Sequence, residues 1–396
     1  MTELSDFSAI VLLVSGGLVL AVLSMRAADR ISLPSSAIFL LATGLLAASI
    51  DALADVVSIK VVERIGVAAL IVILLEGGMH VGLGRFRRSA GPIVALGIVG
   101  TFATASIVTL SAHYLLGLSW ITSGLIGAAI APTDPAVTFS VLGDRKIRGR
   151  SGTILEGEAG VNDPVAIALM IGLIELATTD DGNFGIVAKE FAVEMAVGLA
   201  VGIAGGLLLL RTLRRIQLTS STLHPILLLG SAGIAYGVAG VAHGSGFLAV
   251  FVAGILLGDA ELPRQEEIGA FLAPLAEIAE IGLFAALGLS VGYSALDDPT
   301  VWGQGIVLAV VLAFVARPLV VAPLLIPASL ERGERMFISW AGLKGAVPIL
   351  LGALVVLAGV DAADQIYGIV FVVVLFSIVV QGVSIPRAAD RLLGRT

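Results

Sequence analysis

The sequence has 396 residues, of which 58% are hydrophobic and only 13% are charged, and its net charge is −7. Soluble domains carry about 25% charged residues, so this composition excludes an ordinary soluble globule and a disordered chain. The chain contains no cysteine, which excludes disulfides, thiolate metal centres, iron–sulfur clusters and cysteine nucleophiles. Its apolar residues form long uninterrupted runs, whereas the strands of a membrane barrel alternate polar and apolar positions. An all-α membrane protein is therefore expected.

Thirteen apolar runs are candidate transmembrane helices. A helix needs about 20 residues to cross a bilayer, so thirteen spans occupy roughly 260 residues and leave no room for a soluble domain. The predicted fold class is an all-α polytopic membrane protein, with residues 1–396 in a single integral membrane domain. The predicted spans are 8–25, 36–54, 60–80, 90–116, 120–142, 153–177, 186–211, 223–241, 245–258, 268–293, 301–328, 334–359 and 364–386.

Basic residues alternate strictly between the connections of these spans. Eighteen of the 23 lie after odd-numbered spans, as in Arg85/Arg87/Arg88 and Arg332/Arg335, or in the C-terminal tail. The other connections are acidic, as at Asp297/Asp298. Basic connections face the cytoplasm, so we expect the N-terminus outside, the C-terminus inside and a multi-pass location in the cell (inner, cytoplasmic) membrane.

The fifth and twelfth predicted spans contain helix breakers. Pro132 and Pro135 flank Thr133-Asp134 and remove the helical donors of the Ala128 and Ala131 carbonyls; Pro348 does the same to the carbonyl of Lys344. Unsatisfied backbone at membrane depth persists only against protein or a wet cavity. Simple proline kinks are the alternative interpretation.

The two broken spans are seven spans apart, and an odd offset inverts a repeat in the membrane. This predicts inverted repeats over spans 1–6 and 8–13, at 8–177 and 223–386, joined by span 186–211. Paired broken helices of this kind are typical of a transporter with a central site.

Several ionisable residues fall inside predicted spans. A charge at mid-bilayer costs roughly 2.5–3.5 kcal/mol and therefore needs a partner or water. Asp134 and Asp163, with the Thr133 hydroxyl and freed carbonyls, can hold a desolvated monovalent cation or protons, but not both at once. The alternative is a structural network in which Thr133 and Asn162 satisfy both acids.

The other charged residues in spans allow structural interpretations. A buried ion pair between Glu158 and Lys344 that joins two helices is favoured over direct contact of either with the ion. Arg317 is expected to face a cavity in an architectural role. Glu76, near the end of span 3, is either part of the site or an interfacial carboxylate. Glu277 and Glu280, three residues apart, are expected to line a polar face or funnel.

The ordered motifs resemble the monovalent cation:proton antiporter family 1, especially its NhaP-type sodium/proton antiporters. They are Thr133-Asp134-Pro135, Glu156-Gly-Glu158 followed by Asn162-Asp163, Gly342-Leu-Lys344-Gly-Ala-Val347, Leu75-Glu-Gly-Gly78 and Val380-Gln-Gly382. The chain also looks like the membrane part of cell-volume-regulation potassium/proton antiporters. The resemblance covers nearly the whole chain.

The resemblance implies thirteen spans in inverted repeats, a homodimer and alternating access. It implies ion binding by Asp134 and Asp163, a contribution from Thr133 and, in some members, from the acid matching Glu76, and stabilisation of the site by Asn162. The family's glutamate matching Glu158 pairs with an arginine on the late broken span.

This sequence departs from the family at two positions. Lys344 stands where that arginine is usual, and Ala159 stands where many NhaP-type members have a sodium-ligating serine. Loss of the serine hydroxyl weakens the expectation of sodium. The Asn162–Asp163 pair is associated in the family with electroneutral exchange.

The predicted function is electroneutral exchange of one sodium or lithium ion for one proton, with monovalent cations, protons and lipid as partners. The expected protein is not an enzyme and uses no cofactor and no nucleic acid. A potassium/proton antiporter is the alternative. A remote alternative is an intramembrane aspartyl protease, whose usual Gly-x-Gly-Asp pattern is missing.

Overall fold

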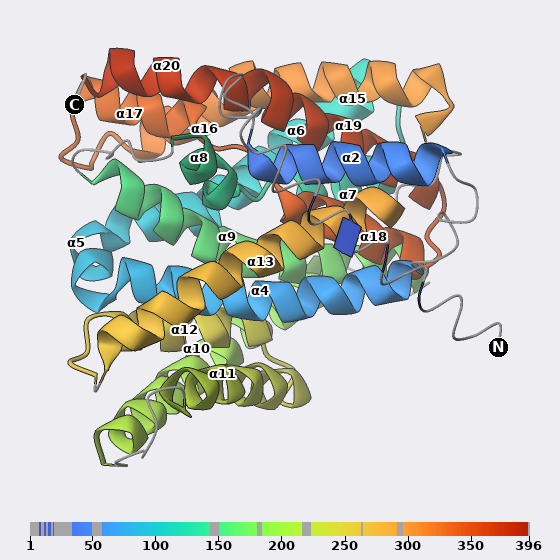
Figure 1. Ribbon diagram of the computed structural model, residues 1–396. Coiled ribbons are helices and arrows are strands. Elements are labelled where there is room, and N and C mark those ends of the chain that lie inside the picture. The colour runs from blue at the N-terminus through green and yellow to red at the C-terminus, as the bar shows by residue number, and fades with distance from the viewer. Residues whose placement is uncertain are drawn as a thin grey trace.

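The computed structural model describes residues 34–49, 58–142, 150–179, 184–215, 223–262, 264–290 and 296–394, with five isolated positions between 8 and 19. In this part of the chain all regular structure is helical. Figure 1 shows the long helices lying side by side, with α10 and α11 at one edge and α16, α17 and α20 at the opposite edge. The predicted span 8–25 lies outside the described residues apart from those isolated positions, as does most of the basic connection 144–150.

The first half of the chain contains helices that follow the predicted ranges closely. They are α2 (Ser35–Ser49), α4 (Ile59–Val81), α5 (Leu83–Val94), the π-helical turn η1 (Ala95–Gly100), α6 (Thr101–Leu116), α7 (Trp120–Ile130), α8 (Pro135–Leu142), α9 (Ser151–Thr178) and α10 (Phe184–Arg215).

The second half continues the pattern with two further π-helical turns. Its elements are α11 (Leu223–Val241), α12 (Gly246–Gly258), α13 (Gln265–Ser290), α15 (Pro299–Val311), η2 (Leu312–Ala316), α16 (Arg317–Leu324), α17 (Arg332–Trp340), α18 (Ala346–Leu357), α19 (Ala363–Phe376), η3 (Ser377–Gly382) and α20 (Val383–Leu392).

Seven helical stretches among the described residues are long and apolar enough to cross a membrane, or eight if the bent pair α7–α8 forms one span. The shorter apolar helices α12 and α18 lie among them. The expectation of an all-α polytopic membrane protein is therefore confirmed. The count of thirteen spans and the inverted repeats stay predictions.

The two predicted breaks lie at the expected positions. Helices α7 and α8 meet at 42° across residues 131–134, and Pro135 begins α8, where its missing N–H has no helical partner to lose. Helix α17 ends at Trp340 and α18 begins at Ala346. Pro164 lies inside the continuous helix α9, so a single proline does not break a helix in this fold.

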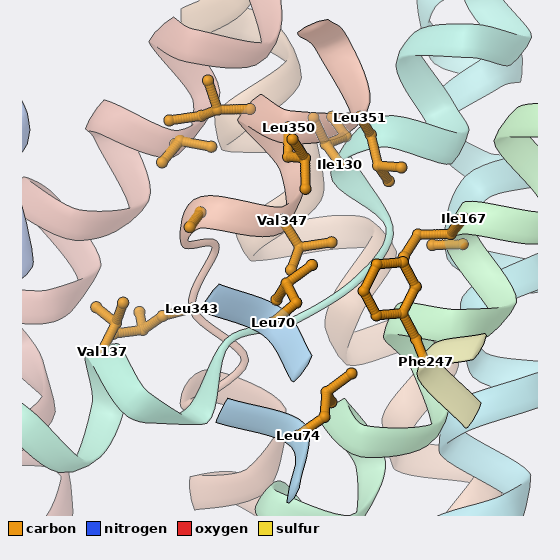
Figure 2. Close-up of a cluster of buried hydrophobic side chains, with 14 of the residues drawn as sticks. Leu70, Leu74, Ile130, Val137, Ile167, Phe247, Leu343, Val347, Leu350 and Leu351 are labelled. Atoms are coloured by element: carbon orange, nitrogen blue, oxygen red, sulfur yellow. The ribbon is translucent and has the colours of Figure 1, made fainter. Parts of the chain in front are cut away.

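Buried apolar side chains pack around the broken segments. Figure 2 shows them coming from α4 (Leu70), α7 (Ile130), α9 (Ile167), α12 (Phe247) and α18 (Leu351). Ile130 and Leu351 are fully buried. This packing excludes water from one side of the breaks.

Helices α4 and α12 approach each other through glycines. A β-carbon added at Gly78 would lie 2.5 Å from the Phe251 carbonyl oxygen, and one at Gly254 would lie 2.7 Å from the Leu75 carbonyl oxygen. These distances are too short for an alanine without movement of one backbone. Small residues at such contacts let membrane helices pack closely, so Gly78 and Gly254 set the separation of α4 and α12.

We expect Gly254→Ala to lower the free energy of unfolding by about 1–3 kcal/mol, because an added methyl group must separate two packed backbones. The matched control is Gly282→Ala on α13, where an added β-carbon meets nothing within 4 Å. The apparent melting temperature of the purified protein in detergent measures both changes. Equal melting temperatures for the two variants would contradict the close approach.

Candidate functional site

The two broken segments cross, and the first donates hydrogen bonds to backbone carbonyls of the second. The Asp134 N–H donates to the Leu343 carbonyl at 2.8 Å, and the Thr138 hydroxyl donates to the Ala341 carbonyl at 2.9 Å. Gly345 lies against the Asp134 carboxylate so closely that a β-carbon would overlap it. The crossing therefore requires glycine at position 345.

Charged side chains satisfy the helix ends at this crossing. The Lys344 ammonium donates to the carbonyls of Ala131 and Pro132, each at 2.8 Å. These carbonyls lie at the C-terminal end of α7, the negative end of its dipole, and that of Ala131 has lost its helical donor to Pro135. The lysine thus occupies the position where a cation is most favourable.

The Asp134 carboxylate accepts hydrogen bonds at two helix N-termini. Its Oδ1 accepts from the Ala136 N–H of α8 at 3.0 Å, and its Oδ2 accepts from the Ala346 N–H of α18 at 3.4 Å. Anions are stabilised at helix N-termini by the unpaired N–H groups and the dipole. Asp134 is therefore held in place by the backbone of both broken segments.

Next to this crossing, α9 presents oxygens that lack a donor. The Asn162 amide donates to the Thr133 hydroxyl at 2.8 Å, which joins α9 to the first break. Within the described residues, Asn162 Oδ1 and Asp163 Oδ1 are buried and accept no hydrogen bond. A buried acceptor without a donor is costly, and a carboxylate oxygen is satisfied there by a proton or a cation.

A cavity of about 890 Å³ leads from these acids to the surface. Asp134, Asp163, Glu76, Glu156 and Glu280 line it, and at the surface it reaches the exposed side chains of two basic residues, His80 and Arg85. Ala159 also lines the cavity and brings no hydroxyl group to it. The cavity therefore combines several carboxylates with a mouth that carries basic groups.

The mouth of the cavity contains an ionisable pair. His80 Nε2 lies 3.5 Å from Glu156 Oε1, with side chains that are 56% and 18% exposed. The Arg85 guanidinium donates to the His80 carbonyl, which fixes the end of α4 against the start of α5. The sequence pattern did not predict this pair.

The predicted pair between Glu158 and Lys344 is wrong. The Glu158 carboxylate accepts hydrogen bonds from both Nη1 and Nη2 of Arg317, the second at 2.9 Å, and both side chains are buried. Planar guanidinium matches a carboxylate with two parallel bonds, which an ammonium cannot do, and the ammonium of Lys344 is occupied by carbonyls. The arginine that the family resemblance places on the late broken span comes here from the start of α16.

Arg317 also connects this pair to the second broken segment. Its Nη2 donates to the Ile338 carbonyl of α17 at 3.4 Å. Arg317 does not line the carboxylate cavity, and its contacts agree with the expected architectural role.

Of the other predicted residues, Asp134, Asp163, Glu76 and Ala159 line the cavity, while Thr133 and Asn162 are buried beside it. Glu280 was missed as a site residue. Its Oε1 is buried and accepts no hydrogen bond among the described residues. The signal was available, because Glu280 is an acid inside an apolar span, as Asp134 is.

A double-mutant cycle tests the corrected pairing. We expect Arg317→Gln alone to cost about 3–5 kcal/mol of unfolding free energy, because it leaves the Glu158 carboxylate buried and unpaired. In the double variant with Glu158→Gln, the change in unfolding free energy should differ from the sum of the two single changes by about 0.5–3 kcal/mol. The measurement is unfolding in detergent by titration with dodecyl sulfate. A larger coupling between Glu158→Gln and Lys344→Gln would restore the original pairing.

Known proteins share this fold and much of this sequence. A solved structure, the sodium proton antiporter MjNhaP1 from Methanocaldococcus jannaschii at pH 8, superposes with a TM-score of 0.83, covers 100% of both chains and is 23% identical. At that identity the similarity shows the fold. It matches the all-α membrane architecture described above.

Curated relatives are similar in sequence. The K(+)/H(+) antiporter NhaP2 of Shewanella sp. (strain ANA-3) is 35% identical over 324 residues, which are 81% of this chain and 56% of that protein. The K(+)/H(+) antiporter NhaP of Alkalimonas amylolytica is 35% identical over 83% of this chain and 57% of its own length. This chain therefore spans little more than half the length of these two relatives.

A relative with a different cation in its name is also similar. The Na(+)/H(+) antiporter NhaH of Halobacillus aidingensis is 28% identical over 76% of both chains. The family described as "Sodium/hydrogen exchanger, transmembrane" matches residues 17–391. Its members are transporters and not enzymes, which rules out the aspartyl protease alternative. The match spans both broken segments and the carboxylates between them, and the chain belongs to this transmembrane sodium/hydrogen exchanger family.

Proposed function

We propose that this protein is an electroneutral antiporter that exchanges one monovalent cation for one proton by alternating access at Asp134 and Asp163. The observation that carries the proposal is the buried Oδ1 of Asp163, which accepts no hydrogen bond from the described residues and belongs to a carboxylate-lined cavity. Such an oxygen needs a proton or a cation, and one site cannot hold both. Competition for this oxygen links the two ions.

Charge counting supports one-for-one exchange. Arg317 neutralises Glu158, and Lys344 and Asp134 contribute opposite charges at the helix ends of the crossing. Among the five charged residues Glu158, Arg317, Lys344, Asp134 and Asp163, this leaves one net negative charge, that of Asp163. One proton or one monovalent cation neutralises it, so the loaded site carries no net charge in either half of the cycle. Glu76 and Glu280 line the same cavity and favour the entry of cations.

Sodium or lithium is the cation that the motifs predict, and potassium is a second candidate. Two observations favour potassium. The relatives at 35% identity are named K(+)/H(+) antiporters, whereas the one named for sodium is 28% identical. Ala159 provides no hydroxyl ligand in the cavity.

The proposed architecture has thirteen spans with inverted repeats at 8–177 and 223–386, joined by 186–211. The N-terminus is outside and the C-terminus is in the cytoplasm of the cell. Support comes from the meeting of the two broken segments, one from each proposed repeat. Arg85 at the cavity mouth lies in a predicted cytoplasmic connection, so this conformation opens inward.

The protein is proposed to work as a homodimer in the cell membrane. Helices α10 and α11 expose apolar side chains at one edge of the fold, such as Leu208 at 66% and Ile234 at 68% exposure. Their surface is available to lipid or to a second copy.

The central test is cation-driven proton movement in liposomes that contain the purified protein and an internal pH dye. We expect sodium, lithium or potassium to drive proton movement at a rate that does not change with imposed membrane potential. Asp163→Asn should reduce the rate to that of empty liposomes. Glu277→Gln, on the exposed side of α13, is the matched control and should keep the parent rate. A fully active Asp163→Asn variant would overturn the proposed site.

Cation preference is tested at Ala159. We expect Ala159→Ser to increase the preference for sodium over potassium by about two- to tenfold, because one hydroxyl contact contributes about 0.5–1.5 kcal/mol. The measurement is the apparent affinity for each cation in the same liposome assay. Ala166→Ser, buried on α9 away from the cavity, should leave the preference unchanged. An unchanged preference in Ala159→Ser would show that this position does not select the cation.

A further inference from the structure

A second cleft lies between α16, α17 and α20. It shares no lining residue with the carboxylate-lined cavity at Asp134 and Asp163, which we call the ion cavity. Its volume is about 880 Å³, within the range of about 300–1,000 Å³ typical of small-molecule sites. The walls are apolar and open to the outside of the fold, with Ile326 at 67% and Met336 at 49% exposure. Trp340 also lines this cleft, which we call the arginine cleft.

Three arginines line the arginine cleft: Arg332, Arg335 and Arg391. Among the described residues none of the three makes an ion pair with a carboxylate. Three positive charges on an apolar cleft are an arrangement that attracts an anion with an apolar part.

The acids nearest to these arginines are engaged elsewhere. Glu331 and Glu334 form a reciprocal capping box at the start of α17. Glu334 Oε1 also accepts from the Arg150 N–H at 3.2 Å and from the Ser151 hydroxyl at 3.4 Å. Asp390, next to Arg391 in sequence, does not line the cleft. The positive charge of the cleft is therefore not cancelled by its own walls.

The position of the cleft fits a lipid better than a soluble anion. The three arginines belong to the connection after span 11 and to the tail after span 13, which the charge pattern places on the cytoplasmic side of the membrane. Basic pockets between transmembrane helices on that side bind anionic lipid headgroups. Guanidinium binds phosphate oxygens through two parallel hydrogen bonds, and the exposed apolar walls offer contacts for acyl chains.

We propose that the arginine cleft binds an anionic phospholipid, with its phosphate held by Arg332, Arg335 and Arg391 and its acyl chains along α16 and α17. The bound lipid braces α17 against α20, which the hydrogen bond from Trp340 Nε1 to Ser384 Oγ already joins at 2.8 Å. This inference does not depend on the transported cation or on the transport activity.

The test uses Trp340 as a local probe. The chain has three tryptophans, so the variant Trp120→Phe/Trp302→Phe leaves Trp340 as the sole fluorophore. The purified protein is placed in vesicles that contain phosphatidylglycerol or phosphatidylcholine with brominated acyl chains, which quench tryptophan on contact. We expect brominated phosphatidylglycerol to quench Trp340 at a several-fold lower mole fraction. Equal quenching by the two lipids would overturn the proposal.

Matched variants identify the residues responsible. Arg332→Gln/Arg335→Gln/Arg391→Gln should abolish the preference, and the corresponding lysine substitutions should keep most of it. Arg87→Gln/Arg88→Gln/Arg211→Gln, which removes three exposed arginines outside both cavities, should keep all of it. A preference that survives the glutamine substitutions in the cleft would refute this site.

A last arm separates lipid from free phosphate. Inorganic phosphate is compared with chloride at equal ionic strength, so that general screening is the same in both. The preference for phosphatidylglycerol should be equal in the two salts. Its specific loss in inorganic phosphate would show that the arginine cleft takes a soluble phosphate, against the lipid proposal.

Discussion

The structure depends on satisfying the backbone of two broken helices inside the membrane. A hydrocarbon interior offers no water to the open ends of a helix, so the protein must supply the partners itself. Lys344 does so for the carbonyl end of α7, and Asp134 does so for the N–H ends of α8 and α18. Lys344, from the second break, binds a helix end of the first, and Asp134, from the first break, binds a helix end of the second. These contacts join the two segments into one unit. The Asp134 carboxylate also leaves no room for a β-carbon at Gly345, so only glycine fits at this position.

This arrangement assigns different tasks to residues of similar chemistry. Lys344 and Arg317 are both buried basic residues, but the lysine donates hydrogen bonds to backbone carbonyls and the arginine donates them to the Glu158 carboxylate. Asp134 and Asp163 are both acids inside the fold, yet Asp134 accepts hydrogen bonds from backbone N–H groups, whereas Oδ1 of Asp163 accepts none from the part of the chain that the structure describes. Of the two acids, Asp163 has the oxygen that no donor occupies, and this agrees with its proposed role as the group that alternates between proton and cation. In the proposed mechanism, cation specificity depends on the groups around this oxygen, and Ala159, which brings only a methyl group, lines the same cavity.

The sequence was sufficient to predict the helices and their breaks because hydrophobic runs and proline pairs act locally. It did not identify the partner of Glu158, since spacing along α9 says nothing about which cation of a distant helix reaches the same carboxylate. The planar guanidinium of Arg317 matches the two carboxylate oxygens of Glu158 better than an ammonium group does. This match becomes visible only when the structure places α16 against α9. Glu280 was assigned to a polar face for a similar reason. Whether Glu277 or Glu280 points into the cavity depends on the rotation of α13, which packing decides.

The ion cavity and the arginine cleft share no lining residue, but they share the elements that carry them. Arg317 begins α16 and reaches α17 at the Ile338 carbonyl, and the following Pro318 lines the cleft. Helix α17 then leads from the cleft to the break that contains Lys344. Alternating access requires this broken unit to move relative to its surroundings. An occupant of the cleft would touch none of the residues proposed to bind the ion, so any effect on the proposed exchange would come through the movement of this unit.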